Sequence, residues 1–321
     1  MARTCTLRLA AAEATGGYGP SVPPSKRLDV AIGDKTVSLS NLDKVLYPRA
    51  GFTKGQVIDY YTRIAPVVLP HLRDRPLTLK RYPNGVEEKF FYEKRCPSHA
   101  PEWVQTASVW SGRNEGNIDF CLCHDLPTVV WLANLADLEL HTPMARAPEM
   151  ENPTMIAFDL DPGPPASIVE CARVALELRR AFDFWGLEAF PKTSGSKGMQ
   201  VYLPLNTLVT YEDTRAFSRG LAQLLERRDP ERVVSDMSKA KRTGKVFVDW
   251  SQNERHKTTV NVYSLRAMER PTVSTPLSWN EVSDIAEGHA MAFTSDQVLS
   301  RVAEMGDLFA PVQTLEQELP R

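Results

Sequence analysis

The pattern of apolar and polar positions predicts strands in several separate parts of the chain. Apolar and polar residues alternate over 77–82, and nearly continuous apolar runs cover 155–160 and 246–250. Short runs of this kind, rich in Val, Ile and Phe, are typical of β-strands. Val30–Ile32 and Thr36–Leu39, joined by a glycine turn, predict a hairpin. Further strands are expected on either side of 193–198 and over Thr258–Tyr263.

Helices are expected where a capping signal precedes apolar residues at helical spacing. Thr53 with Gln56, and Ser167 with Glu170, have the spacing of a capping box. Asp125 stands just before a proline in a predicted first turn, where proline is favoured. We therefore expect helices to begin just after Thr53, Asp125 and Ser167.

The ends of these helices are less clearly marked. Pro66 is expected to kink or end the first helix, because proline lacks the backbone N–H that a helix interior needs. The helix after Asp125 is expected to run to about Leu138 and to deliver His141 just beyond its end. Two more helices are expected around 217–225 and over about Ser295–Met305.

The order of these elements favours an α+β fold. Strands and helices are interleaved, but many strands are joined by short turns, which favours mostly antiparallel sheets. The domain is expected to cover 28–312, between a flexible N-terminal tail or tag remnant at 1–27 and a C-terminal tail at 313–321. The polar, glycine-containing stretch from Ser111 to Asn117 is interpreted as a mobile loop.

Composition narrows the possible partners and surroundings. With 38 Lys and Arg against 40 Asp and Glu, the net charge is −2, so a nucleic-acid surface must come from local clusters of basic residues. No apolar run approaches the ~20 residues of a membrane span, and the N-terminus lacks the apolar core of a signal peptide.

The five cysteines suggest reduced thiols in the cytosol. A zinc site is an alternative for some of them, although the Cys-x-Cys spacing is tighter than usual. Its candidate ligands are Cys96, His99, Cys121, Cys123 and His124.

Two aspartates end the apolar run at 155–160 and lie two residues apart. Side chains at this spacing share one face of a strand, so Asp159 and Asp161 are expected to point the same way. Two carboxylates this close repel each other unless a cation lies between them, and Mg²⁺ or Mn²⁺ prefers oxygen ligands of this kind. A strand end with two solvated acids is the simpler alternative.

Two other motifs could complete this site if their strands are neighbours. Asp249 ends the run at 246–250, and three carboxylates can hold two cations about 3.5–4 Å apart for phosphoryl chemistry. Thr193–Gly198 reads Thr-Ser-Gly-Ser-Lys-Gly, which can present backbone N–H groups, hydroxyls and a lysine to an anion. The spacing is not that of a P-loop, and a strand follows it instead of a helix. An acid paired with Lys245 and a plain hairpin turn are the alternatives.

Four motifs, in order, resemble the polymerase domain of bacterial ligase D, a double-strand-break repair family of the archaeo-eukaryotic primase superfamily. The resemblance runs from about Val37 to Ala310 and implies the primase-type fold. The motifs are Phe158-Asp159-Leu160-Asp161-Pro162-Gly163, Thr193-Ser194-Gly195-Ser196-Lys197-Gly198, Val246-Phe247-Val248-Asp249-Trp250-Ser251-Gln252-Asn253 and Tyr263-Ser264-Leu265-Arg266.

The resemblance also implies roles for individual residues. Asp159, Asp161 and Asp249 would bind two Mn²⁺ or Mg²⁺ ions and act as the catalytic acids. The residues that would contact or lie near the incoming nucleotide are His141, Ser194, Ser196, Lys197, Gly198, Arg242, Gln252 and Arg266.

The same resemblance implies contacts with a broken DNA end. Lys44 and Lys54 would bind its 5′-phosphate, which suits two lysines near a helix N-terminus. Phe90 and Phe91 would stack on template bases, a contact that tolerates any sequence. Without the resemblance, solvated lysines and core phenylalanines would be the default interpretation.

The implied activity is template-directed nucleotidyl transfer, with ribonucleotides preferred, in end joining or gap repair. The sequence lacks a Lys-x-Asp-Gly ligase motif, so this polypeptide is expected not to seal nicks; a stand-alone enzyme and an excised domain both remain open. A Ku protein and a separate ligase are the implied partners, in the cytoplasm and at the nucleoid. A metal-dependent nuclease and a non-catalytic DNA-end-binding module are the alternatives.

Overall fold

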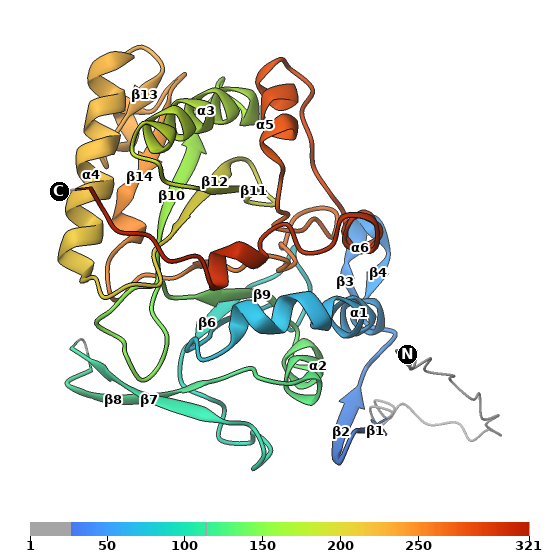
Figure 1. The fold of residues 1–321 in the computed structure, drawn as a ribbon. Helices are drawn as coiled ribbons and strands as arrows, with labels where there is room; N and C mark the ends of the chain where they lie inside the picture. The colour runs from blue at the N-terminus through green and yellow to red at the C-terminus, as the bar shows by residue number, and fades with distance from the viewer. Residues whose placement is uncertain (1–26, 113, 321) are drawn as a thin grey trace.

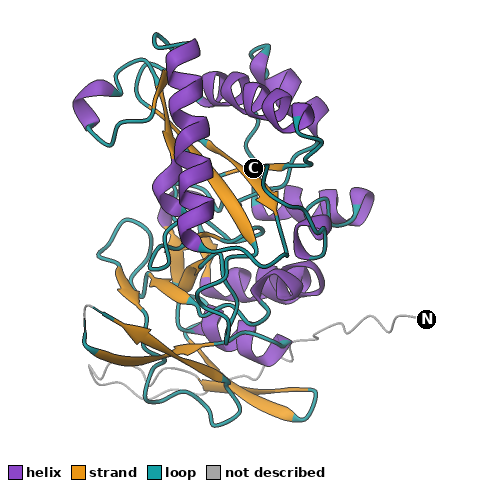
Figure 2. Cartoon of the chain, turned by 60° about the vertical axis from the view of Figure 1, so that its left-hand side comes forward, coloured by secondary structure: helices purple, strands orange, loops and turns teal. Residues whose placement is uncertain are grey.

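A computed structural model describes residues 27–112 and 114–320. The predicted N-terminal tail therefore lies outside the described residues, except for Arg27, which begins the first strand. Figure 1 shows the chain as two stacked parts, each with its own sheet. In both views the two-stranded hairpins β7–β8 and β1–β2 lie at the end of the molecule opposite α3, α4 and α5 (Figures 1 and 2).

The first part is built on a five-stranded sheet in the order β11-β12-β10-β14-β13. All neighbouring strands are antiparallel except β13 and β14, which are parallel. Its helices α3 and α4 pack against β10, and α5 packs against α3. The strands are β10 (Met155–Pro162), β11 (Phe190–Thr193), β12 (Met199–Pro204), β13 (Val233–Val234) and β14 (Val246–Asp249). The helices are α3 (Ile168–Phe184), α4 (Tyr211–Arg228) and α5 (Trp279–Ala286).

The second part is built on a four-stranded sheet in the order β15-β9-β5-β6, whose pairs are all antiparallel. Helices α1 and α2 pack against each other, and α6 packs on α1. The strands are β5 (Thr78–Arg81), β6 (Phe91–Glu93), β9 (Asp137–Thr142) and β15 (Thr259–Val260). The helices are α1 (Lys54–Leu72), α2 (Leu126–Asn134) and α6 (Ser295–Met305).

Three hairpins and four short 3₁₀ helices complete the described chain. The hairpins pair β1 (Arg27–Ile32) with β2 (Lys35–Ser40), β3 (Val45–Tyr47) with β4 (Phe52–Thr53), and β7 (Thr106–Ser111) with β8 (Gly116–Cys121). The 3₁₀ helices are η1 (Pro48–Ala50), η2 (Lys239–Lys241), η3 (Trp250–Gln252) and η4 (Ala310–Gln313).

The capping signals place the helix starts as predicted. Thr53 and Gln56 form the reciprocal capping box of α1, with the Gln56 side chain accepting from the Thr53 N–H at 2.8 Å. Ser167 and Glu170 do the same at the start of α3. The Asp125 carboxylate accepts from the Thr128 N–H at 3.0 Å and caps α2. Each cap supplies an acceptor for an N–H group that the helix itself leaves unpaired.

Two predicted helix ends differ from the structure. Pro66 does not end α1, which continues to Leu72 because its buried face keeps packing in the core on both sides of the proline. The helix after Asp125 ends at Asn134, since Ala136 takes a positive φ that breaks it. Leu138 therefore lies on β9, and His141 lies within that strand instead of after a helix.

The structure adds detail to the predicted loop, strand and C-terminal tail. Ser111, Gly116 and Asn117 lie on the paired strands of the β7–β8 hairpin, and of Thr258–Tyr263 only Thr259–Val260 is a strand. The predicted C-terminal tail is docked over its described residues: the Gln317 N–H donates to Leu205 O at 2.8 Å, and Leu319 packs against the core of the five-stranded sheet.

Candidate active site

The register between β10 and β14 brings the three aspartates to one place. Asp159 lies directly opposite Asp249 in this antiparallel pair. Directly opposite residues in such a pair have Cα atoms about 4.5–5.5 Å apart. Asp161 lies two residues further along β10 and therefore on the same face of the strand as Asp159. Three acids from two distant parts of the sequence thus meet on one face of the paired strands β10 and β14.

Burial and mutual repulsion make these acids hold their protons more tightly. Burial, together with the charges of Asp161 and Asp249, raises the pKa of Asp159 to about 7. The pKa of Asp161 is also raised, by burial and by Asp249, while Arg242, Arg266 and Lys197 oppose that rise. Asp159 keeps part of its surface open and Asp161 is exposed, so both remain accessible although they lie deep among protein atoms. A divalent cation would relieve this repulsion, and the donor set therefore fits a hard metal ion.

Two of the three carboxylates, those of Asp159 and Asp249, are turned toward protein donors. Asp249 accepts from the Ser251 N–H at 2.9 Å, the Ser251 hydroxyl at 2.6 Å and the Gln252 side-chain amide at 2.8 Å. Asp159 accepts from the Gln200 amide at 3.1 Å. In the part of the chain that the structure describes, no three His, Cys, Asp or Glu side chains stand in a finished metal-binding arrangement. Holding a metal thus requires carboxylate rotation, chiefly at Asp249.

The Thr193–Gly198 loop joins β11 to β12 right beside the acids. Met199 pairs with Leu160, so the loop enters next to Asp161. The Ser194 hydroxyl accepts from the N–H groups of Ser196 at 3.3 Å and Gly198 at 3.2 Å. Lys197 is exposed, and Ser196 is exposed with its hydroxyl 3.4 Å from Met268 Sδ. The loop therefore has the donors of an anion site, with two of its N–H groups held by its own serine.

Glycine allows this loop to approach the neighbouring chain closely. A Cβ atom on Gly198 would overlap the carbonyl oxygen of Leu160. Gly195 has a φ of +69°, and a Cβ atom there would overlap Val273 and Arg266. Both positions therefore require glycine for packing as well as for conformation.

Two arginines and a glutamine surround the acids and the loop. Arg266 donates to the carbonyl oxygen of Ser194, which ties it to the loop. Arg242 donates to Met237 O at 2.8 Å and lies over the Phe247 ring at 3.6 Å. Gln252 is the last residue of η3, which Asp249 caps at its start. Asn253, just after η3, anchors this turn by hydrogen bonding to the N–H and the carbonyl oxygen of Ala157, each at 2.8 Å. The predicted residues of the nucleotide site other than His141 therefore cluster around β10 and β14.

His141 reaches this region from the other sheet. It lies on β9, and its Nε2 is 3.0 Å from Glu139 Oε2. The same carboxylate forms an ion pair with the Lys80 ammonium at 3.2 Å and lies 3.4 Å from Arg266 Nε.

Sequence reasoning missed Glu139 and Lys80 as site residues. A charged residue within the otherwise apolar run Leu138–Leu140 was the one available signal, because a buried charge requires partners.

Lys44 and Lys54 form a separate basic pair near the start of α1. Lys54 is buried, and its Nζ donates to the Ser40 hydroxyl at 3.5 Å. Burial, helped by the charges of Lys44 and Arg81, lowers the pKa of Lys54 to about 8. Lys44 donates to the Asn84 side chain at 2.9 Å. Two like charges held together in this way favour an anion between them.

Phe90 and Phe91 are not core residues. Their exposed fractions are 49% and 43%, far more than core packing allows. Phe90 lies against Tyr82 and Tyr92, with ring centroids 5.2 and 5.8 Å apart, and the Arg81 guanidinium lies 5.2 Å from the Phe91 ring. These exposed rings beside basic groups can serve as a stacking surface.

The cysteine and histidine candidates for zinc do not form a ligand set in the described chain. His124 pairs with Asp74 at 3.0 Å and with Gln105 at 2.9 Å. Cys121 and Cys123 are buried, and Cys96 is half-buried. These side chains therefore serve packing and local hydrogen bonding.

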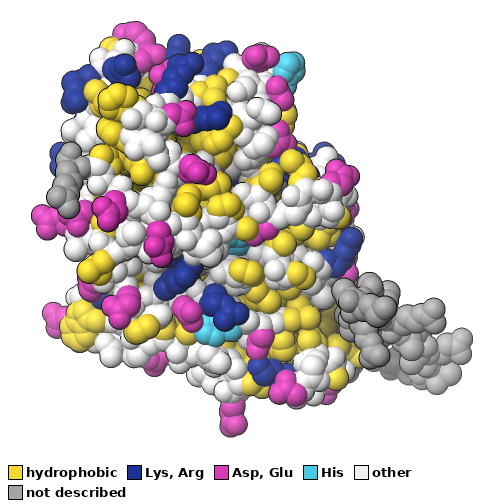
Figure 3. Space-filling view, viewed as in Figure 1, with side chains coloured by type: hydrophobic (Ala, Val, Ile, Leu, Met, Phe, Trp, Pro, Cys, Tyr) yellow, Lys and Arg dark blue, Asp and Glu magenta, His cyan; other side chains and the backbone are white. Residues whose placement is uncertain are grey.

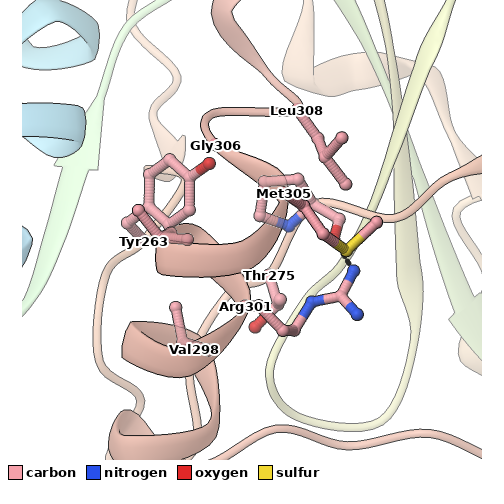
Figure 4. A pocket seen from close by; sticks show the side chains of 9 residues that line it. Tyr263, Thr275, Val298, Arg301, Met305, Gly306 and Leu308 are labelled. Carbon is pink, nitrogen blue, oxygen red and sulfur yellow. Dashed lines mark hydrogen bonds between the residues drawn. The ribbon is translucent and has the colours of Figure 1, made fainter.

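A hollow in the described structure lies away from the acids. It is lined by α6 and the 263–276 segment, with Tyr263 and Val298 on one side and Met305 and Leu308 on the other (Figure 4). Arg301 points into it and donates to Pro276 O at 3.2 Å. Its polar side chains are already paired, Arg301 with Glu281 at 2.6 Å and the Tyr263 hydroxyl with Asp307 at 2.6 Å, and its described lining includes no acidic residue.

The surface offers no single large basic face on the side drawn in Figure 3, where acidic and basic side chains are interspersed. No helix within the described ranges combines the length and apolar character needed to cross a membrane.

Comparison with known proteins agrees with this geometry. A family model described as "LigD, primase-polymerase domain" matches residues 53–309. The chain belongs to this family. The LigD end-joining protein of Mycolicibacterium smegmatis is 41% identical over 278 residues, which is 86% of this chain and 36% of that protein. The LigD protein of Bacillus subtilis is 33% identical over 285 residues, 88% of this chain and 45% of that protein.

A solved structure has the same fold as this chain. The polymerase domain of Mycobacterium tuberculosis ligase D, in complex with DNA, superposes with a TM-score of 0.82 at 39% identity and covers 88% of this chain and 99% of that one. The predicted α+β fold of the archaeo-eukaryotic primase type is therefore confirmed, and the chain is a nucleotidyltransferase of the primase-polymerase class. It spans a little over a third of the length of the mycobacterial LigD relatives it matches.

Proposed function

We propose that this LigD-type domain extends primers or fills gaps at DNA ends that carry a 5′-phosphate, in end joining or gap repair. Nucleoside triphosphates are its second substrate, with ribonucleotides preferred. The observation that carries the proposal is the placement of Asp159 directly opposite Asp249, with Asp161 on the same face and the Lys197 loop beside it.

Asp159, Asp161 and Asp249 would hold two Mn²⁺ or Mg²⁺ ions. When bound, such ions lower the pKa of the primer 3′-hydroxyl and neutralise charge on the transferred phosphoryl group and on the pyrophosphate that leaves. The chain's own part is to hold three carboxylates together on one face of β10 and β14, where burial and their mutual repulsion raise the pKa values of Asp159 and Asp161. Ser251 and Gln252 fix the orientation of the Asp249 carboxylate through three hydrogen bonds.

The nucleotide would lie between the acids and the Thr193–Gly198 loop. Lys197 and Arg266 supply positive charge for a triphosphate, and Ser194 and Ser196 supply hydroxyl donors. Support comes from the contact of Arg266 with Ser194 and from the charges of Lys197 and Arg242, which oppose the rise in the pKa of Asp161. The proposed nucleotide-binding residues are His141, Ser194, Ser196, Lys197, Gly198, Arg242, Gln252 and Arg266.

The broken DNA end would bind on the other part of the molecule. Lys44 and Lys54 are close enough for their charges to interact, which suits a phosphate dianion. Phe90 and Phe91, exposed beside Arg81, would stack on template bases at about 1–3 kcal/mol per base. Stacking ignores base identity, which suits an enzyme that must accept any end.

The partners and surroundings of the full pathway are part of the proposal. The relatives are named as non-homologous end joining proteins, and this chain matches only part of their length. A Ku protein, a separate ligase and a place in the cytoplasm at the nucleoid are proposed on this likeness alone.

One gel assay tests the proposal. A gapped duplex with a 5′-phosphate is incubated with Mn²⁺ and with each ribo- or deoxyribonucleoside triphosphate. A longer primer supports the polymerase, a shorter primer points to a nuclease, and a shifted but unchanged primer points to a DNA-end-binding module.

A further inference from the structure

One buried carboxylate connects several basic groups of the candidate site. Glu139 lies on β9 with only 2% of its side chain exposed. Lys80 is its direct cross-strand partner on β5, and His141 lies two residues along the same face of β9. Arg266 reaches it from the loop after β15. Three segments of the chain thus bring a basic side chain to one acid.

The two oxygens of Glu139 have different partners. Oε2 lies 3.2 Å from Lys80 Nζ, 3.0 Å from His141 Nε2 and 3.4 Å from Arg266 Nε. Oε1 accepts from the Ala267 N–H at 3.0 Å and from the Tyr82 hydroxyl at 3.5 Å. One oxygen of the carboxylate therefore binds the backbone beside Arg266, and the other contacts the three basic side chains.

We propose that Glu139 is a positioning residue, which orients His141 and Arg266 and restrains Lys80 for binding of the incoming nucleotide. The inference rests on the proposed function, because it takes the nucleotide roles of His141 and Arg266 from it. Glu139 itself is too deeply buried to contact the nucleotide.

The geometry gives each contact a consequence. Arg266, which forms an ion pair with Glu139 on one side, donates on the other to the carbonyl oxygen of Ser194 in the nucleotide loop. The Glu139 carboxylate can only accept a hydrogen bond, so His141 Nε2 must carry a proton. In the neutral ring, Nδ1 is then unprotonated and can accept a hydrogen bond from another group. Lys80 is held within 4.7–5.8 Å of the rings of Phe90, Tyr92 and Tyr82, so the network also touches the aromatic surface.

Charge explains why a carboxylate is required here. Burial alone would raise the pKa of Glu139, but the hydrogen bond from His141 and the charges of Arg266, His141 and Lys80 lower it well below its usual range. The acid stays ionised and offsets part of the positive charge. With a neutral His141, the group formed by Glu139, Lys80 and Arg266 keeps a net charge of about +1, which suits a polyanionic ligand.

Glu139→Gln is the direct test, because it keeps the shape but leaves one acceptor oxygen. The amide must turn its NH₂ group either toward the basic side chains or toward the Ala267 N–H. We expect the KM for nucleoside triphosphate to rise by about 10- to 100-fold, the range seen when a supporting partner of a ligand-binding group is lost. Both kcat at saturating nucleotide and the affinity for a 5′-phosphorylated DNA end should stay within about threefold of wild type.

The pH profile separates positioning from a loss of structure. Glu139 raises the pKa of His141, which burial otherwise lowers. In Glu139→Gln the limb of the KM profile that reports His141 protonation should therefore move to lower pH. Asp137→Asn is the matched control, since Asp137 is a buried acid on the same strand whose carboxylate forms no ion pair with the basic side chains around Glu139 among the described residues. Its KM and pH profile should match wild type.

Glu139→Asp keeps the charge and withdraws it by one methylene group. A rise in KM of about three- to tenfold is expected, and this variant decides the matter if Glu139→Gln does not fold. A wild-type nucleotide KM in folded Glu139→Gln, or in folded Glu139→Asp where the first is unfolded, overturns the inference. Absence of extension and of nucleotide binding in the wild-type protein would instead overturn the proposed function, so the two failures are distinguishable.

Discussion

Asp249 has two sets of partners within reach. Its carboxylate caps η3 through the Ser251 N–H, and its Cα lies opposite Asp159. The capping contact holds the side chain in one orientation, while the register places it where a metal would need it. An amide side chain could also cap η3, but it lacks the negative charge that a metal site needs. Removing the charge while keeping the cap therefore separates the structural role from the chemical one.

Changing Asp249 to Asn tests this distinction. Asn keeps an acceptor for the Ser251 N–H, so the melting temperature should change little, whereas the loss of a metal-binding charge should lower primer extension by about 10³-fold. Asp183→Asn, at the exposed end of α3, is the control and should extend normally. Extension by Asp249→Asn at the wild-type rate would refute the metal role.

Lys54 gives a pH-dependent prediction at the same scale. Its pKa is lowered to about 8 by burial and by the nearby charges of Lys44 and Arg81, so the free side chain loses its proton as the pH rises through 8. Binding a phosphate dianion requires the protonated form. The ratio of affinities for phosphorylated over unphosphorylated DNA ends should therefore fall between about pH 7 and pH 9.

Lys54→Arg serves as its control. Arg stays charged throughout this range, so the ratio should lose its pH dependence. A ratio that is flat in the wild type, or that changes equally in both proteins, would contradict the assignment of Lys54 to the phosphate pocket.

At the scale of elements, the loop between β11 and β12 is fixed by its fit against β10. Changing Gly198 to Ala would push a Cβ atom into the Leu160 carbonyl, so the loop must move away from the acids. We expect a loss of about 1–3 kcal/mol in the free energy of unfolding and a higher nucleotide KM. Thermal unfolding and steady-state kinetics measure the two effects.

Gly220→Ala, in a helix that packs on the same five-stranded sheet, is the matched control. Gly220 lies in α4 with open space around its Cα, so a methyl group meets no neighbour. This variant should be more stable by about 0.5–1 kcal/mol, because alanine is the better helix former, and its KM should be unchanged. Equal KM values in the two variants would mean that the loop does not position the nucleotide.

Elements with a local chemical signal could be predicted from the sequence, and elements that depend on distant contacts could not. The capping residues Thr53, Asp125 and Ser167 mark helix starts because the bond that defines each start is local. The end of α1 beyond Pro66 depends on core packing, and Leu138 belongs to β9 because that strand pairs with β5. Periodicity alone carries no information about such partners.

At the scale of the whole molecule, the C-terminal segment closes over the five-stranded sheet. The Gln317 side chain accepts from the Glu188 N–H at 2.7 Å and donates to Glu188 O at 3.0 Å and Pro204 O at 2.7 Å. Changing Gln317 to Ala should lower the free energy of unfolding by about 1–2 kcal/mol. Glu316→Ala, at an exposed neighbour, should leave the thermal melt unchanged, and equal melts for both would show that the segment adds no stability.

The arrangement of the site shows the same division between local and distant information. Asp159 and Asp161 could be placed on one face from their spacing, but the register that sets Asp249 opposite Asp159 follows from the pairing of β10 with β14. For Glu139 the sequence offers only a charge within an apolar run, because its three basic partners lie in separate segments.

The most direct test of the account is to locate Mn²⁺ by anomalous scattering in crystals of the protein soaked with Mn²⁺ and a nucleoside triphosphate. The account predicts two peaks within coordination distance of Asp159, Asp161 and Asp249, with the triphosphate running toward Lys197. Peaks held by other residues, or no peak at these three acids when nucleotide is bound, would contradict it.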